Sequence, residues 1–255
     1  MSTYVRLAVG LAVLLAIAVA VSYRTGLRRQ RDLLVASLRA VIQLALVAAA
    51  LRGVFAAPIT SALVVAVMFS VASWTAARRL RGGGDEGRGV IQAVLLSCGA
   101  GSAVVIAIIV ALPTLDRNVR TFVAVSGIVL GGTMTGATLA GRHLNEGLRR
   151  RQDEIEAWLS IGATPRQAVR DVARAAASEA LVPGLDQTRT VGLVTLPGAF
   201  VGALLGGASA AGAARFQVAV LVGLLCAQTI TVTLLTYLLG APSTLPATAA
   251  DVARK

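Results

Sequence analysis

Residues 91–112 read IQAVLLSCGAGSAVVIAIIVAL and contain no charged side chain. A helix of about 20 apolar residues is long enough to cross the hydrocarbon core of a bilayer. With six further runs of this kind, the candidate spans are residues 4–22, 33–51, 58–77, 91–112, 121–141, 191–206 and 217–239. The hydrophobicity of each run is continuous, whereas the strands of a membrane barrel alternate apolar and polar residues. The sequence therefore predicts an all-α membrane protein, a polytopic bundle of about seven transmembrane helices in one domain over residues 1–255.

The composition excludes a soluble enzyme of this size. Hydrophobic residues make up 56% of the chain and charged residues 14%, whereas soluble domains carry about 25% charge. The only lysine is Lys255 and no GxxxxGK[ST] string occurs, so the chain cannot be an ordinary P-loop ATPase by itself. Cys98, Cys226 and the single histidine, His143, are far apart in the sequence, which supports neither a disulfide framework nor a zinc site. We expect no catalytic residue and no cofactor in this chain.

Basic residues predict the orientation of the bundle. The first, third and fifth connecting segments and the C-terminal tail contain 18 of the 24 lysines and arginines, and the opposite segments contain only Arg52, Arg117, Arg120 and Arg215. Cytoplasmic loops carry the excess of basic residues. The pattern predicts a multi-pass protein of the cell (inner or plasma) membrane, with its N-terminus outside and its C-terminus cytoplasmic. This bias and nearby anionic lipid also explain the net charge of +12, so we expect no nucleic-acid partner.

The first run has one competing interpretation, as the core of a signal peptide. Ala18-Val19-Ala20 resembles a small-residue cleavage site. However, four arginines follow this run and only Arg6 precedes its apolar core, which opposes translocation of the following segment. We therefore interpret residues 4–22 as the first span.

The long basic segment at residues 142–190 contains an amphipathic helix pair. Apolar side chains recur at helical spacing among charged ones up to Gly162, which is typical of a helix terminator. Thr164, Pro165 and Gln167 then fit a capping box that starts a second helix, which the sequence predicts to end at Pro183-Gly184. Such a pair can project into the cytoplasm and bind a soluble partner, or it can lie flat on lipid headgroups.

Two strings in this region resemble a known family. Residues 156–162, EAWLSIG, fit the Glu-Ala-x4-Gly pattern of the loop by which membrane subunits of ABC transporters engage their ATPase subunits. Residues 154–167, EIEAWLSIGATPRQ, and residues 190–198, TVGLVTLPG, resemble the iron-export ABC transporter permease family of FetB type. The similarity extends to Arg39 with Gln43-Leu44 and to Arg215-Phe216-Gln217.

The resemblance implies a permease subunit that exports iron or another metal, works as a homodimer in the lipid bilayer, and takes energy from a separate ABC ATPase subunit that binds ATP. Plant relatives associated with aluminium tolerance also look similar, so the resemblance does not fix the cargo. Residues 142–190 would be the coupling segment. Its expected ATPase-coupling residues are Glu156, Ala157, Gly162, Thr164, Pro165, Arg166 and Gln167.

Polar and helix-breaking residues inside the runs are candidates for the transport pathway. Arg39 lies six residues into its run and Gln43 follows four residues later, so the two share a helix face that can point into the bundle. Alternatively, Arg39 extends to the headgroup region. Pro197 and Gly198 predict a kinked or broken helix beside the pathway, although glycines at 198, 202 and 206 also suit close helix packing.

The fifth run supplies two more candidates by resemblance. Family members often have Gly-Asn followed by Met there, whereas this chain has Gly131-Gly132-Thr133-Met134-Thr135. The resemblance makes Met134 and Thr135 pathway candidates, and it assigns no metal ligand.

A secondary transporter or channel that works without an ATPase is the alternative function. All acidic residues lie outside the apolar runs, so no intramembrane carboxylate is available to carry a proton or hold a bare cation. A membrane-embedded enzyme is disfavoured because the sequence shows no clustered His, Asp or Glu.

Overall fold

The computed structural model describes residues 3–54, 58–80, 87–112, 115 and 118–241, and these residues form helices without any β-strand. Six of the helices, α1–α5 and α9, are long and apolar enough to cross a membrane. The predicted fold class, a polytopic all-α membrane protein, is confirmed. The helix bounds are α1 Thr3–Arg24, α2 Gln30–Val54, α3 Pro58–Leu80, α4 Gly87–Ala111, α5 Val119–Arg150, α6 Gln152–Ser160, α7 Pro165–Thr190, α8 Gly198–Leu205 and α9 Ala210–Leu239.

The chain divides into two compact units, Met1–Thr60 and Ser61–Lys255. In the first, α1 and α2 form a helical hairpin whose turn contains Gly26 with φ +69° and is closed by a bond from the Leu27 amide to the Ser22 carbonyl, 3.1 Å long. Almost none of the apolar surface of α1 and α2 is buried. Such helices are typical of lipid-facing or partner-facing segments.

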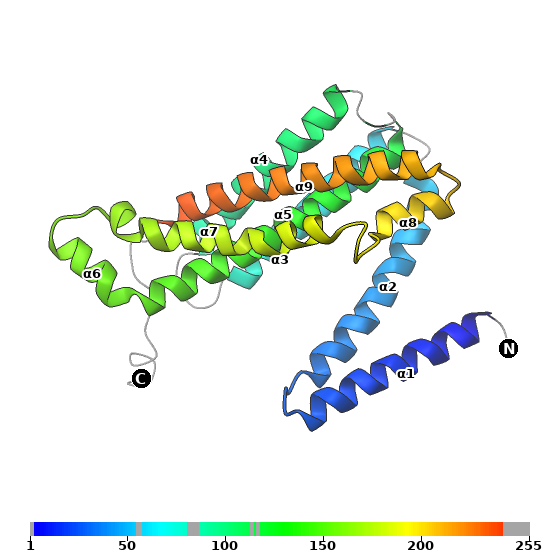
Figure 1. Ribbon diagram of the computed structural model, residues 1–255, viewed down its shortest axis with the longest axis horizontal. Helices are drawn as coiled ribbons and strands as arrows, with labels where there is room; N and C mark the ends of the chain where they lie inside the picture. The colour runs from blue at the N-terminus through cyan, green and yellow to red at the C-terminus, as the bar shows by residue number, and fades with distance from the viewer. Residues whose placement is uncertain (1–2, 55–57, 81–86, 113–114, 116–117, 242–255) are drawn as a thin grey trace. The chain divides into compact units, whose positions relative to one another are not determined.

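In the second unit, α4, α5 and α9 form the centre of the bundle. Figure 1 shows α5, α7 and α9 lying side by side, with α6 at one end of them and α8 at the other. Small residues let these helices approach closely, as at Gly101 of α4, where an added Cβ would lie 2.5 Å from the Ala227 carbonyl oxygen of α9. The main buried cluster joins five helices through Ala76, Ala77, Leu80, Ala93, Val94, Cys98, Ala137, Ala140, Ala180, Val232 and Leu235.

Polar groups also link the central helices. The Ser102 and Thr133 hydroxyls are 3.3 Å apart between α4 and α5, and the Thr231 hydroxyl donates to the Ser97 carbonyl across 3.2 Å. Inside a bilayer such groups must find partners within the protein, because lipid tails offer none. These contacts therefore help to fix how α4, α5 and α9 pack.

The segment predicted as the sixth span is not a transmembrane helix, and that prediction was wrong. Residues 191–197 are not helical, and α8 has only eight residues, which makes it about 12 Å long. Gly192, at φ +80°, and Pro197, which is the N-cap of α8, interrupt the helix before it. Gly207, at φ +90°, follows α8 and turns the chain into α9.

Helix α7 is longer than predicted, because it continues through Pro183 to Thr190. Its buried residues include Ala176, Ala180 and Gly184, and Gly184 lies so close to α9 that an added Cβ would contact the Gln228 side chain. Gln228 in turn donates to the Gly132 carbonyl of α5 across 3.4 Å. The last turns of α7 therefore lie beside the middle of α5 and α9, and α7 with α8 forms an interrupted element along the bundle.

Thiol labelling tests the predicted orientation. In a variant lacking Cys98 and Cys226, single cysteines placed at Asp116 and at Gly83 should react with an impermeant thiol reagent from opposite sides of the membrane. Asp116 should react from outside, because basic residues predict a cytoplasmic location for the segment around Gly83. Both positions lie outside the described residues, so the expectation rests on sequence. Reaction of both cysteines from one side would contradict the predicted topology.

Candidate coupling turn and cleft

The turn between α6 and α7, which we call the coupling turn (residues 151–167), is built on the end of α5. With 32 residues, α5 is about 48 Å long, whereas a hydrocarbon core is about 30 Å thick. Its charged last turns therefore extend beyond that core. Ile155 of α6 and Val169 and Val172 of α7 pack on these turns, in a buried cluster of Leu144, Leu148, Ile155, Ala168, Val169, Val172 and Ala176. This cluster fixes both short arms of the turn to α5.

Backbone geometry at Gly162 ends α6. Its φ is +91°, a left-handed conformation that glycine adopts without steric cost. The Gly162 amide donates to the Leu159 carbonyl across 3.0 Å, and the Ala163 amide donates to the Trp158 carbonyl across 3.1 Å. These two bonds form a Schellman motif, which satisfies carbonyls left open at the helix end. The predicted terminator role of Gly162 is confirmed.

The capping box at the start of α7 is also confirmed. Thr164 is the N-cap, and its hydroxyl accepts from the Gln167 amide across 3.4 Å. The Gln167 side chain accepts from the Thr164 amide across 2.8 Å, and Pro165 occupies the first helical position. The direction of the chain is therefore set on both sides of Ala163 by local hydrogen bonds.

The outer surface of the coupling turn combines apolar and charged side chains. Trp158 is 49% exposed and Ile161 is 74% exposed, and both Glu156 and Ala157 are exposed beside them. Exposed aromatic and aliphatic side chains at the tip of a charged helix pair are typical of protein-binding surfaces.

An ion pair closes the base of the coupling turn. The Arg151 guanidinium donates to both carboxylate oxygens of Glu154, across 2.7 and 2.6 Å. This hydrogen bonding lowers the pKa of the Glu154 carboxyl below its usual value. Glu154 therefore stays ionised at neutral pH and holds Arg151 at the junction of α5 and α6.

Arg166 connects the coupling turn to α9. Its guanidinium donates to the Tyr237 hydroxyl, and its Cζ lies 4.2 Å from the centroid of the Tyr237 ring. The turn is thus attached to α5 by packing and to α9 by this contact. All seven residues predicted for ATPase coupling lie in this one turn and are exposed, although Arg166 and Gln167 also line a groove beside α9.

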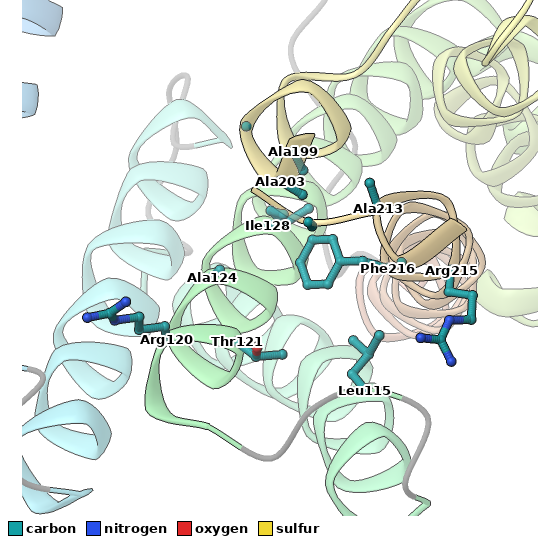
Figure 2. A pocket seen from close by; sticks show the side chains of 13 residues that line it. Leu115, Arg120, Thr121, Ala124, Ile128, Ala199, Ala203, Ala213, Arg215 and Phe216 are labelled. Atoms are coloured by element: carbon teal, nitrogen blue, oxygen red, sulfur yellow. The ribbon is translucent and has the colours of Figure 1, made fainter. Parts of the chain in front are cut away.

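At the opposite end of the bundle, α5, α8 and α9 enclose a cleft of about 820 Å³. Figure 2 shows the Phe216 ring in the middle of this cleft, with Ala199 and Ala203 of α8 above it and Arg120 and Arg215 on either side. The lining residues are Leu115, Arg120, Thr121, Ala124, Ile128, Ala199, Gly202, Ala203, Ala208, Gly212, Ala213, Arg215 and Phe216. The cleft has both polar and apolar lining, with Arg120 and Arg215 at its rim.

The pathway candidates are not brought together in one site. Pro197 and Gly198 begin α8 and so position its cleft-lining residues. Met134 is half-buried against the main cluster, and the Thr135 hydroxyl bonds only its own helix, at the Gly131 carbonyl. Neither lines the cleft.

Two further pathway candidates, Arg39 and Gln43, belong to the first unit. Both are exposed on α2, and their role in a pathway stays a prediction.

Arg120, Phe216 and the buried Gln228 were not predicted as site residues. The sequence signal for Phe216 was its place in the resembling Arg-Phe-Gln string, and for Gln228 a lone amide in an apolar run. Within the described structure, the Gln228 Oε1 atom has no hydrogen-bond partner at the junction of α5, α7 and α9. A buried acceptor without a donor is costly, so this atom marks a place where water or another hydrogen-bond donor would be stabilised.

Comparisons with known proteins cover nearly the whole chain. The family described as "Uncharacterised protein family (UPF0014)" matches residues 5–242. The chain is 34% identical to UPF0014 membrane protein STAR2 of Oryza sativa subsp. japonica, over 88% of this chain and 78% of the relative. It is 31% identical to Protein ALUMINUM SENSITIVE 3 of Arabidopsis thaliana, over 89% of this chain and 82% of the relative. It is 28% identical to the probable iron export permease protein FetB of Escherichia coli, over 88% of this chain and 86% of the relative. No solved structure matches it.

Proposed function

Because this chain belongs to the UPF0014 family of membrane proteins, we propose that it is the permease subunit of an ABC transporter. The observation that carries the proposal is the coupling turn, in which a Schellman motif and a capping box set the direction of a charged, partly apolar protrusion. Its exposed apolar side chains are typical of a protein-binding surface, which favours a soluble partner such as an ATPase.

The mechanism couples the turn to the rest of the bundle. A partner ATPase would contact Glu156, Trp158 and Ile161 in the cytoplasm and move the turn when ATP closes its domains. The buried cluster around Ile155 transmits this displacement to α5, and the Arg166–Tyr237 contact transmits it to α9. Since α5 and α9 also bound the distant cleft, rigid-body movement of these helices would open and close it.

Resemblance supports the remaining parts of the proposal. ABC permeases work in pairs, so we expect a homodimer with one ATPase on each coupling turn. The name of the Escherichia coli relative, a probable iron export permease, supports iron or another metal as cargo, moved out of the cytoplasm. The cleft with Arg120 and Arg215 at its rim suits a metal that leaves with anionic ligands more than a bare cation.

Activity of the purified protein tests the proposal. Alone, it should hydrolyse ATP no faster than background, because it has no P-loop. Added ATPase from the same organism should bind it and show permease-stimulated hydrolysis. Cells that lack both subunits should accumulate more iron under iron overload than cells that express both.

Three outcomes separate the parts of this proposal. Metal export by the permease alone in sealed vesicles would favour a secondary transporter or channel. If the cellular iron content is unchanged and the content of another metal changes, that metal is the cargo and the proposed mechanism stands. Failure to bind any ATPase would contradict the proposed class.

A further inference from the structure

A second groove, which we call the basic groove, lies between the first half of α7 and the last turns of α9. Its volume is about 570 Å³. Arginine and alanine side chains of α7 form one wall and hydroxyl side chains of α9 form the other. The lining residues are Arg166, Gln167, Arg170, Ala173, Arg174, Ala177, Thr233, Thr236, Tyr237 and Gly240.

Three positively charged guanidinium groups line this groove. Arg166, Arg170 and Arg174 are spaced four residues apart, so they form one stripe along α7. Like charges at this spacing destabilise a helix unless an opposite charge compensates them. Among the described residues, the ion pairs are Arg29–Asp32, Arg150–Glu146, Arg151–Glu154 and Arg189–Asp186, and none of them includes a residue of the stripe.

Carboxylates near the stripe lie on its other side. Asp171 lines a separate groove with Glu154 and Trp158, next to the coupling turn, and only Gln167 and Arg170 contribute to both grooves. The basic groove itself contains no acidic residue. Arg170 also lines the groove that contains Glu154 and Asp171, whereas Arg166 and Arg174 have no acidic residue in either groove beside them and are left to solvent ions or a bound anion.

The hydrogen-bonding groups of the groove suit a phosphate. Arginine forms bidentate hydrogen bonds with phosphate oxygens. The Tyr237 hydroxyl already accepts from Arg166, which leaves its own hydrogen available to donate. The Thr236 hydroxyl donates to the Val232 carbonyl. The hydroxyls of Tyr237 and Thr233 are therefore the donors that remain for a ligand.

The location of the groove favours a lipid as the source of that phosphate. Gly240 directly follows helix α9, which with 30 residues is longer than a hydrocarbon core is thick, so we expect the groove to lie near the headgroup region. From there its floor continues along the bundle past Ala173 and Ala177 to Thr233, and these small side chains offer an apolar surface to an acyl chain. Basic pockets between membrane helices on the cytoplasmic side are typical binding sites for anionic headgroups.

We propose that the basic groove binds the phosphate of an anionic phospholipid, with Arg170 and Arg174 as its main ligands and one acyl chain lying along Ala173 and Ala177. The groove faces α9 but shares Arg166 and Gln167 with the predicted ATPase-coupling residues, so its main ligands, Arg170 and Arg174, are the residues that distinguish lipid binding from ATPase binding. A bound lipid there would neutralise the stripe and hold α7 against α9.

Lipid binding by the purified permease, without any ATPase, tests this proposal. The probe is phosphatidylglycerol, compared with phosphatidylcholine, titrated onto delipidated permease in detergent and followed by native mass spectrometry. The wild type should prefer phosphatidylglycerol. The double variant Arg170→Gln/Arg174→Gln should bind it about tenfold more weakly, because two guanidinium contacts are lost.

A matched double variant controls for net charge. Arg142→Gln/Arg149→Gln removes two exposed arginines near the end of α5 that carries the coupling turn. This variant should change lipid binding less than twofold. Arg170→Lys/Arg174→Lys keeps the charge but loses the bidentate hydrogen bonds, so it should bind more tightly than the Gln variant and more weakly than the wild type.

Three results would overturn the proposal. Equal loss in both Gln variants would show that only net charge attracts the lipid. Unchanged binding in Arg170→Gln/Arg174→Gln would place the lipid elsewhere. Displacement of phosphatidylglycerol by millimolar inorganic phosphate would make the groove a site for soluble phosphate.

Discussion

Replacement of Gly162 by valine is expected to abolish transport and to weaken copurification of the partner ATPase, while the permease still inserts and folds. An added Cβ at Gly162 would meet no atom within 4 Å, so the effect comes from the backbone. At φ +91° a β-branched residue is strained by ~1–3 kcal/mol. The chain relieves this strain by leaving the left-handed conformation, which breaks the Schellman bonds and redirects the coupling turn.

ATP-dependent metal efflux from vesicles, together with recovery of the ATPase on the tagged permease, measures this effect. The matched control is Gly26→Val, because Gly26 also has a positive φ, +69°, and open space around its Cβ but lies in the α1–α2 turn. This control imposes similar strain and should keep ATPase binding. Normal transport by Gly162→Val would show that the α6–α7 pair rests on lipid headgroups and transmits no force.

The capping box offers a graded version of the same test. Thr164→Ala removes the hydroxyl that accepts from the Gln167 amide and should cost ~1 kcal/mol of local stability. Because the left-handed turn at Gly162 remains, we expect transport to fall partially and not to vanish.

Replacement of Gly101 by alanine should produce the largest loss of stability in the bundle. The new methyl group would lie 2.5 Å from the Ala227 carbonyl oxygen and would also clash with the Thr231 hydroxyl. Because the carbonyl belongs to the backbone of α9, no side-chain rotation relieves the contact, and α4 and α9 must separate. We expect a cost of ~3 kcal/mol and a fall in the unfolding temperature of about 10 °C in detergent.

Gly131→Ala is the matched control for this substitution. Gly131 also lies inside a long helix, α5, but an added Cβ there would meet nothing within 4 Å. Since alanine favours helix more than glycine does, the control should be as stable as the wild type or more stable. Equal melting of the two variants, followed by tryptophan fluorescence or by loss of monodisperse protein on heating, would contradict the close approach of α4 and α9.

Long apolar runs and local caps could be predicted from the sequence because both depend on neighbouring residues. Six of the seven apolar runs are membrane-length helices, and the terminator at Gly162 and the capping box at Thr164 have the predicted geometry. In each of these cases the decisive interactions join residues a few positions apart.

The end of α7 could not be predicted in this way. Pro183 lacks the amide hydrogen of a helix interior and is a typical helix stop. In the fold, however, Ala176, Ala180 and Gly184 face α5 and α9, and this tertiary packing outweighs the local cost. The first part of this face, Ala168, Val169, Val172 and Ala176, follows from the helical spacing in the sequence and is buried, but its continuation at Ala180 and Gly184 beyond Pro183 depends on the tertiary fold.

The cleft and the basic groove also depend on contacts between distant segments. Arg120 and Phe216 are about a hundred positions apart in the sequence and line the same cleft only because α5 and α9 start at the same end of the bundle. Arg174 and Thr233 likewise meet because α7 and α9 are antiparallel. A single sequence carries no signal for such pairs, and for this reason the predicted pathway residues did not coincide with the cleft.

The interrupted element made by α7 and α8 has a consequence for biosynthesis. Helix α7 carries arginine and acidic residues along most of its length and is not among the helices apolar enough to cross a membrane, so the translocon has no apolar segment to release sideways into lipid. The alanine face of α7 packs on α5, which is synthesised before it, and on α9, which is synthesised after it. Helix α7 can therefore dock on α5 first, and its packing is completed only when α9 has left the ribosome.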